Sequence, residues 1–141
     1  MPTPAEIKKA LLQAGVEVYR TRSDGVHVAE RVRENLLMDS GIVVGAEPLR
    51  ITFVVRAQRN DFPGAADEHL FERARGQARP AAARGYCERG TSLREVTDPG
   101  DSQRTLDTWC EVQFEKTVAS LDLVAGEVGF ILSLEKTAVP R

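Results

Sequence analysis

The densest group of side chains that could perform chemistry is Asp61, Asp67, Glu68 and His69. Carboxylates beside a histidine could bind a metal ion or transfer protons. However, Asp67 and Glu68 fall in the first turn of an expected helix, where the helix dipole favours acidic side chains. Since no second histidine lies nearby in the sequence, we interpret the group as a helix start. We therefore assign no catalytic or metal-ligating residue.

The remaining candidates for chemistry are one histidine and two cysteines. His27 alternates with Val26 and Val28, so we expect a solvent-facing residue of a strand. Cys87 and Cys110 could pair if their strands are neighbours, or one could be a nucleophile. Neither has a flanking histidine signature, so structural thiols are favoured. The chain contains no glycine-rich phosphate loop and no paired-cysteine metal motif, and no cofactor is expected.

A run of arginines without intervening acids, Arg73, Arg75, Arg79 and Arg84, could hold a phosphate or an acidic partner. A solvated helix face continuing into a loop explains the run equally simply, and we favour that interpretation. Trp109 precedes an alternating strand and could either cover a second core layer or anchor an interface. The candidate partner-binding residues are Trp109, Phe62, Phe71, Arg73 and Arg75.

The bulk composition suits one folded domain over residues 1–141. The chain is 42% hydrophobic and 28% charged, which is enough apolar surface for a core. A formal net charge of -2 argues against a general binder of nucleic acid or anionic membranes. The sequence shows neither a signal peptide nor a long apolar span, so a cytoplasmic protein is expected.

The first half of the chain predicts a helix followed by strands. Thr3, Pro4 and Glu6 form the signature of a capped helix start, and Gly15 is a natural stop. A hairpin is expected over Val16 to Val28 and a strand over Leu49 to Val55. The stretch from Glu30 to Met38 fits either a continued strand or a helical turn. Loops are expected at Ser40-Gly41 and from Gly45 to Pro48.

The second half predicts a helix, two strands and a final helix. Apolar spacing indicates a helix from Ala66 to Gly76, then either a helical turn or a mobile connection over residues 79–85. A weak strand is expected over residues 86–96 and a loop over residues 97–102. Residues 108–118 predict a half-buried strand with Cys110, Val112 and Phe114 inward and Glu111, Gln113 and Glu115 toward water. The tail from Ser120 fits a helix or a strand, and the helix is favoured.

These elements predict an α+β fold with one antiparallel sheet packed by helices, in the order α-β-β-β-α-β-β-α. This order resembles the type III secretion chaperone fold and its relatives. The resemblance is carried by the helix Thr3–Ala14, the hairpin Val16–Val28, the strand Leu49–Val55, the helix Ala66–Gly76, the strand Thr108–Val118 and the tail from Ser120. Residues 79–85 and the glycines of the tail depart from the family's pattern.

The resemblance implies binding through an exposed sheet face and helix grooves rather than catalysis. In that family an extended segment of a partner lies along apolar patches or adds a strand. We therefore expect a protein partner and a homodimer, with no membrane contact. Two alternatives stay open: a regulator that binds nucleic acid or another anion through Arg73–Arg84, and a small enzyme in which His27 or His69 meets carboxylates in a pocket.

Overall fold

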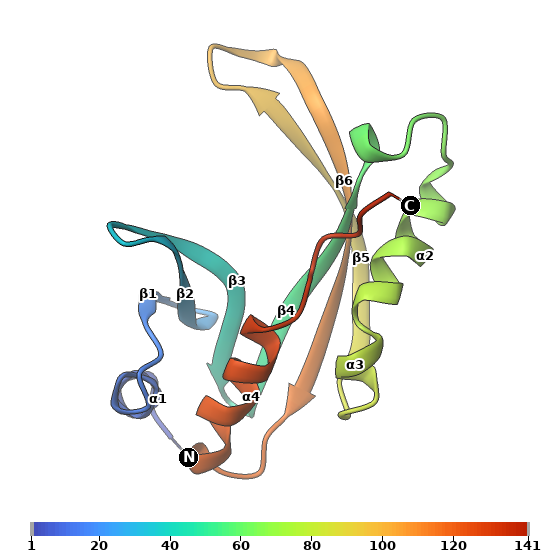
Figure 1. Ribbon diagram of the computed structural model, residues 1–141. Helices are drawn as coiled ribbons and strands as arrows, with labels where there is room; N and C mark the ends of the chain where they lie inside the picture. The colour runs from blue at the N-terminus through green and yellow to red at the C-terminus, as the bar shows by residue number, and fades with distance from the viewer. Residues whose placement is uncertain (1, 141) are drawn as a thin grey trace. The chain divides into compact units, whose positions relative to one another are not determined.

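The computed structural model describes residues 2–140 of the chain. These residues form four α-helices, α1 to α4, and six strands, β1 to β6, which are labelled in Figure 1. Their bounds are α1 Pro4–Gln13, β1 Val18–Arg22, β2 Gly25–Arg33, β3 Leu36–Ala46, β4 Leu49–Gln58, α2 Asp67–Gln77, α3 Arg79–Ala82, β5 Cys87–Asp98, β6 Asp101–Thr117 and α4 Val124–Leu132. Two short 3-10 helices, η1 (Arg59–Asp61) and η2 (Leu121–Leu123), complete the order.

The predicted α+β class is confirmed: the six strands form one antiparallel sheet in the order β1-β2-β3-β4-β6-β5, packed by helices. The element order differs from the prediction by one strand and by the short helix α3, which is the helical turn left open as one alternative for residues 79–85. The ambiguous residues 30–38 continue β2 and begin β3, and the expected loop at Ser40-Gly41 lies inside β3. The helix favoured for the tail is confirmed as α4.

The chain divides into two compact units, each built from two separate segments. Within the described residues, unit 1 comprises residues 2–53 and 115–134, and unit 2 comprises residues 54–114 and 135–140. Strands β4 and β6 contribute residues to both units. A boundary between consecutive domains is therefore invisible in the sequence, because each unit is completed by a later part of the chain.

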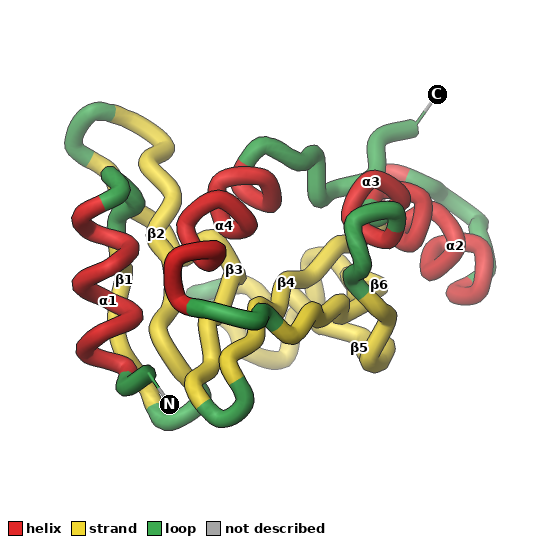
Figure 2. Tube along the Cα trace, turned by 90° about the horizontal axis from the view of Figure 1, so that it is seen from below, coloured by secondary structure: helices red, strands yellow, loops and turns green. Residues whose placement is uncertain are grey.

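Unit 1 packs α1 and α4 with β1, β2 and β3. The Thr3 side chain and Glu6 form the predicted capping box, and Gly15 follows the helix with a φ of 83°. Such a cap stabilises a helix by about 1 kcal/mol. The buried apolar side chains of this unit include Ile7, Leu11, Val26, Val28, Ile42, Val44, Ile51, Phe53, Val124, Val128 and Ile131. In Figure 2, α4 lies above β3 and β4.

The pairing of β2 with β3 is interrupted by a bulge. His27 pairs with Val43 and Ala29 pairs with Asp39, so β3 has two more residues than β2 in this interval. Gly41, at a φ of 79°, provides the backbone turn that the extra residues need. This local geometry explains why the sequence around Ser40 and Gly41 has the composition of a loop although the strand continues through it.

Unit 2 packs α2 and α3 on one side of its strands, as Figure 2 shows. Leu70, Phe71 and Ala74 of α2 are buried, as the helical spacing predicts. The chain's last described residues join the same unit: Arg56 of β4 donates its backbone N–H to Lys136 and accepts from Ala138, both at 2.8 Å. The tail thus adds a short parallel bridge to β4 on the side where pairing with β3 has ended.

Strand β6 confirms one face of its predicted pattern and corrects the other. Cys110, Val112 and Phe114 are buried as expected. Glu111 was expected to face water, but it is only 9% exposed, and Arg56 Nη2 lies 3.2 Å from its carboxylate. The expected loop over residues 97–102 is shorter than predicted, since β5 runs to Asp98 and β6 starts at Asp101.

Cys87 and Cys110 are both free thiols, the first exposed and the second buried.

Candidate partner-binding surface

Trp109 lies in unit 2 between two arginines. The guanidinium carbon of Arg56 is 4.8 Å from the centre of the indole ring, and that of Arg94 is 5.7 Å away. The indole N–H donates to Asp107 Oδ2 at 3.1 Å. These contacts fix a half-buried ring by cation–π attraction and one hydrogen bond. These contacts agree with the interpretation that Trp109 covers a second core layer. Because the ring is only half-buried, the interpretation that it anchors an interface also stays open.

The other predicted residues of unit 2 lie on or near α2. Phe62 and Phe71 are buried, and the Arg73 guanidinium is 5.3 Å from the Phe62 ring centre. Arg75 bonds Glu88 of β5 at 2.8 Å and Glu72 at 2.5 Å. The structure therefore brings Arg73 to Phe62, but it gives the two phenylalanines a packing role.

Two members of the arginine run, Arg73 and Arg75, already contact neighbouring side chains. Two carboxylates neutralise Arg75, and the hydrogen bond that Arg75 donates to Glu88 is the main reason that the pKa of Arg75 is raised. Arg73 is held over an aromatic ring instead. The attraction of Arg73 and Arg75 for a phosphate is reduced, because each of these two guanidiniums already has an aromatic or acidic neighbour. The geometry therefore favours the interpretation of the run as a helix face over an anion site.

At the start of α2, one of the acidic side chains is paired with a nearby arginine. Asp67 bonds Arg59, and this contact is the main reason that the pKa of the Arg59 guanidinium is raised. His69 is exposed on α2. Within residues 2–140, no three His, Cys, Asp or Glu side chains are arranged to hold a metal ion.

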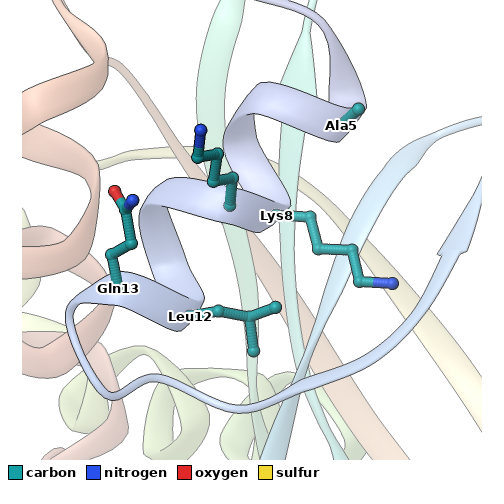
Figure 3. A pocket seen from close by; sticks show the side chains of 5 residues that line it. Ala5, Lys8, Leu12 and Gln13 are labelled. Carbon is teal, nitrogen blue, oxygen red and sulfur yellow. The ribbon is translucent and has the colours of Figure 1, made fainter.

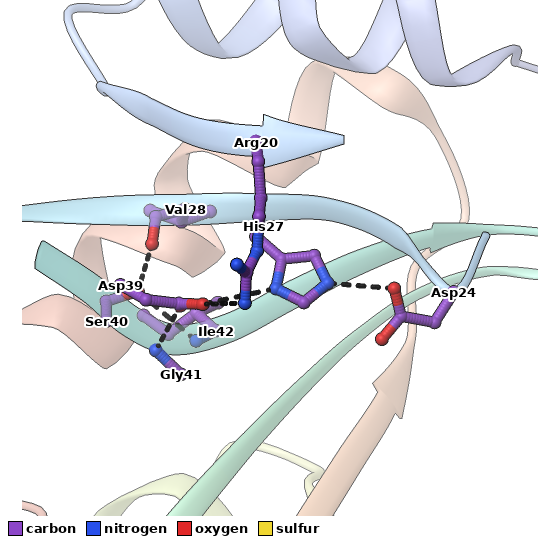
Figure 4. Close-up of polar contacts among 8 residues, drawn as sticks. All are labelled: Arg20, Asp24, His27, Val28, Asp39, Ser40, Gly41 and Ile42. Carbon is purple, nitrogen blue, oxygen red and sulfur yellow. Dashed lines mark hydrogen bonds and ion pairs between the residues drawn. The ribbon is translucent and has the colours of Figure 1, made fainter. Parts of the chain in front are cut away.

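His27 was predicted to face solvent, and that prediction is wrong. Figure 4 shows its ring in unit 1 between two carboxylates. Nε2 lies 2.8 Å from Asp24 Oδ1, and Nδ1 lies 3.3 Å from Asp39 Oδ2. Arg20 donates to the same Asp39 oxygen at 3.3 Å. The ring is 9% exposed because the bulge of β3 carries Asp39 over it.

This network has the residue types of an acid–base site, but its contacts connect neighbouring strands. Both ring nitrogens of His27 lie at hydrogen-bond distance from carboxylate oxygens of the chain itself, so neither is open to a substrate. Asp39 also accepts from the backbone N–H of Gly41 at 2.9 Å, and Ser40 Oγ donates to the Val28 carbonyl at 2.6 Å. The group joins β1, β2 and β3 at the bulge, and the hydrogen bond from His27 is the main cause that lowers the pKa of Asp24.

The largest exposed apolar group of unit 1 lies at the end of the β2–β3 hairpin. We call Arg31–Met38 the hairpin tip. Val32 and Met38 are each 50% exposed, Leu36 is 43% and Leu37 is 38% exposed. In Figure 1 this end of the hairpin stands away from α1 and α4. The sequence does not predict the hairpin tip as a surface, because its apolar residues also fit a helical turn or a continued strand.

The hairpin tip is held in a defined shape by one arginine. Arg31 donates to Glu17 Oε1 from Nε at 3.1 Å and from Nη2 at 2.6 Å, and its third donor bonds the Glu34 carbonyl. A groove lined by Val16, Glu17, Glu30, Arg31 and Leu132 lies in the same unit. Because Arg31 belongs to both, the groove begins where the hairpin tip ends.

A second, shallower groove follows one face of α1. Figure 3 shows its lining by Ala5, Lys8, Lys9, Leu12 and Gln13. Leu12 is 51% exposed, and two lysines flank it. This mixture of an apolar floor and basic edges would suit an acidic and apolar segment, but the surface comes from a single helix and encloses little.

Comparison of the chain with protein-family models, with curated proteins and with solved structures finds no match. Across residues 2–140, no helix combines the length and the apolar character that crossing a membrane requires.

Proposed function

We propose that the chain is a secretion-chaperone-like protein that binds an extended, partly apolar segment of another protein at the hairpin tip. One observation carries the proposal: four large apolar side chains, Val32, Leu36, Leu37 and Met38, are exposed on eight successive residues. Exposed apolar groups of this kind mark interaction sites on protein surfaces.

Two features of unit 1 support the proposal. The bonds from Arg31 to Glu17 and to the Glu34 carbonyl hold the tip before any partner arrives, which reduces the ordering cost of binding. The adjoining groove extends the surface past Glu30, so that a segment several residues long could lie along it. The resemblance of the element order to secretion chaperones points the same way, because their partners bind as extended segments.

The test is capture of a partner with a tagged chain from its native lysate, followed by titration of the purified partner. We expect the native chain to recover one protein in stoichiometric amount. The variant L36S/L37S/M38S should raise the dissociation constant at least tenfold, since apolar anchors at the centre of an interface commonly contribute about 1 kcal/mol or more each.

The matched control is Leu12→Ser, which removes an equally exposed leucine from the α1 groove. It should bind the partner as the native chain does. If Leu12→Ser loses the partner and the tip variant retains it, the α1 groove is the binding surface. Recovery of nucleic acid instead of protein, with binding that weakens steeply as salt rises, would support the anion-binding alternative.

A further inference from the structure

Strand β5 ends the sheet with a long open edge. It is 12 residues long and last in the strand order, and within residues 2–140 no backbone bridge covers its outer side. Ten of its residues are exposed and the other two are half-buried. The opposite edge, β1, has only five residues, and a bulge interrupts its pairing. Long edges usually carry features that prevent pairing with another chain.

The protective features expected of such an edge are weak on β5. The strand contains no proline and no lysine, and Leu93 is 54% exposed. Its charges near the centre are balanced, with Glu88 and Arg89 on one side of Ser92 and Arg94 and Glu95 on the other. A strand with opposite charges placed symmetrically about its centre can pair with a second copy of itself.

Symmetry restricts how two copies of β5 can pair. When a two-fold axis relates two antiparallel copies of one strand, one residue must lie opposite its own copy. In any other register, directly opposite residues would have side chains on different faces of the sheet, which strand pairing does not allow. With Leu93 on the axis, Glu88 would oppose Asp98, which is a repulsive pair. With Gly90 on the axis, no opposite charges meet.

Three registers pair opposite charges. Val96 on the axis places Arg94 opposite Asp98, but this register pairs only residues 94–98 at the end of β5. Thr91 on the axis places Glu88 opposite Arg94, but it puts Leu93 opposite Arg89, so the two copies of Leu93 stay apart. Ser92 on the axis places Arg89 opposite Glu95 twice. It also places the two copies of Leu93 diagonally across the axis on one face, where long side chains reach each other.

We propose that the protein forms a homodimer in which β5 pairs antiparallel with β5 of a second copy, with Ser92 on the two-fold axis. Main-chain hydrogen bonds along the open edge hold the two copies together. Two Arg89–Glu95 pairs select the register, and the contact covers the exposed Leu93. The interface lies within unit 2 and does not depend on the proposed function of the hairpin tip in unit 1.

Charge reversal tests the interface in solution by light scattering and sedimentation. The native chain should be a dimer, and a chain that stays monomeric up to its solubility limit would overturn the proposal. Arg89→Glu and Glu95→Arg should each raise the dimer dissociation constant about 10- to 100-fold, because two attractive pairs become repulsive. The double variant R89E/E95R restores opposite charges and should dimerise again.

The control for charge reversal is Arg22→Glu, which makes the same change at the other edge of the sheet. It should remain a dimer, as should the tip variant L36S/L37S/M38S, so failure of the dimer and failure of the proposed function are separable. A dimer that neither Arg89→Glu nor Glu95→Arg weakens would place the interface elsewhere and overturn the proposal. Circular dichroism of each variant reports that it is folded.

Cysteine cross-linking tests the register. In a Cys87→Ser background, Ser92→Cys places two thiols opposite each other with Cα atoms about 4.5 or 5.5 Å apart, depending on the pair type. A disulfide spans either distance. We expect mild oxidation to cross-link Ser92→Cys efficiently. Cross-linking of Thr91→Cys in its place would overturn the proposed register.

Discussion

Strands β4 and β5 belong to the same antiparallel sheet, but they differ in how the fold uses them. In β4, every second residue is buried: Leu49, Ile51, Phe53, Val55 and Ala57. In β5, no residue is buried. The apolar alternation of β4 specifies one face for the core, whereas the sequence of β5 has no apolar face to bury.

The difference separates two tasks within one sheet. Strand β4 buries one face in the core, so substitutions on that face should change the free energy of unfolding. Strand β5 contributes little apolar area to the core, so its sequence is free to carry an edge for another chain. The same contrast occurs within the β2–β3 hairpin, whose inner end is buried from Gly25 to Ala29 and whose tip is exposed. Both exposed regions are where we place binding.

The largest expected effect is a difference in the rate at which the two cysteine thiols react. Cys87 on β5 is exposed, whereas Cys110 on β6 is buried, and burial raises the pKa of the Cys110 thiol. Reaction of Cys110 requires an opening that costs about 4 kcal/mol or more, which slows it at least about a thousandfold. With a chromogenic disulfide reagent, we expect one fast and one slow thiol. Cys87→Ser should remove only the fast phase, and two fast phases in the native chain would contradict the burial of Cys110.

Substitution of an apolar residue should lower the free energy of unfolding much more in β4 than in β5. Phe53→Ala in β4 should lower the free energy of unfolding by about 3–5 kcal/mol, because a fully buried ring leaves a cavity. Leu93→Ala in β5 removes an exposed side chain and should change the free energy by no more than about 0.5 kcal/mol in dilute solution. Urea denaturation followed by circular dichroism measures both. Equal losses would mean that β5 is part of the core.

Charged pairs should show the same contrast with a smaller effect. On β4 and β6, Arg56 Nη2 lies 3.2 Å from Glu111 Oε2, at ion-pair distance but without the alignment of a hydrogen bond. Glu111→Ala leaves a largely buried guanidinium without its carboxylate and should cost about 1–3 kcal/mol. Arg104 and Asp98, on the β5–β6 ribbon, are 3.8 Å apart and more exposed. Arg104→Ala should cost less than about 0.5 kcal/mol.

The measurement is again urea denaturation, at low and at high salt. Screening by salt should leave the cost of Glu111→Ala almost unchanged, because water is largely absent around that carboxylate. A cost below that of Arg104→Ala would show that Glu111 is exposed in solution, as its place in the alternating sequence suggested.

The parts of the fold that could be predicted from sequence are those governed by local chemistry. The capping signature of Thr3 and Glu6 fixes the start of α1, and apolar alternation fixes the buried face of β4. Strand β3 was missed in part because Gly41 permits a bulge, and a bulge contains the residues of a loop.

The candidate sites were harder to predict because they depend on which residues remain uncovered. Val32 and Leu36 have the same types as core residues, yet both are exposed at the hairpin tip. The environment of His27 depends on Asp39, which reaches it through the same bulge. Neither relation has a sequence spacing that repeats, so periodicity could not show it.

The smallest effect concerns the turn between β1 and β2, at the buried end of the hairpin. The hydrogen bond from His27 lowers the pKa of Asp24 below its ordinary value of 3.8. A carboxyl whose pKa is lower in the folded state stabilises the fold above its unfolded pKa, and this contribution is lost as the pH falls through the folded pKa. Asp24→Asn should therefore be less stable than the native chain near neutral pH, by less than about 1 kcal/mol because the group is mostly exposed.

The stability difference between the native chain and Asp24→Asn should decrease as the pH falls below about 3.8, where the unfolded carboxyl becomes protonated. Urea midpoints measured across acid pH values give this difference directly. In a His27→Gln background the same comparison should give a nearly flat profile, since the main cause of the pKa shift has been removed. A difference that grows toward low pH would have the wrong sign for a carboxylate stabilised by His27. It would show that the contact in Figure 4 does not persist in solution.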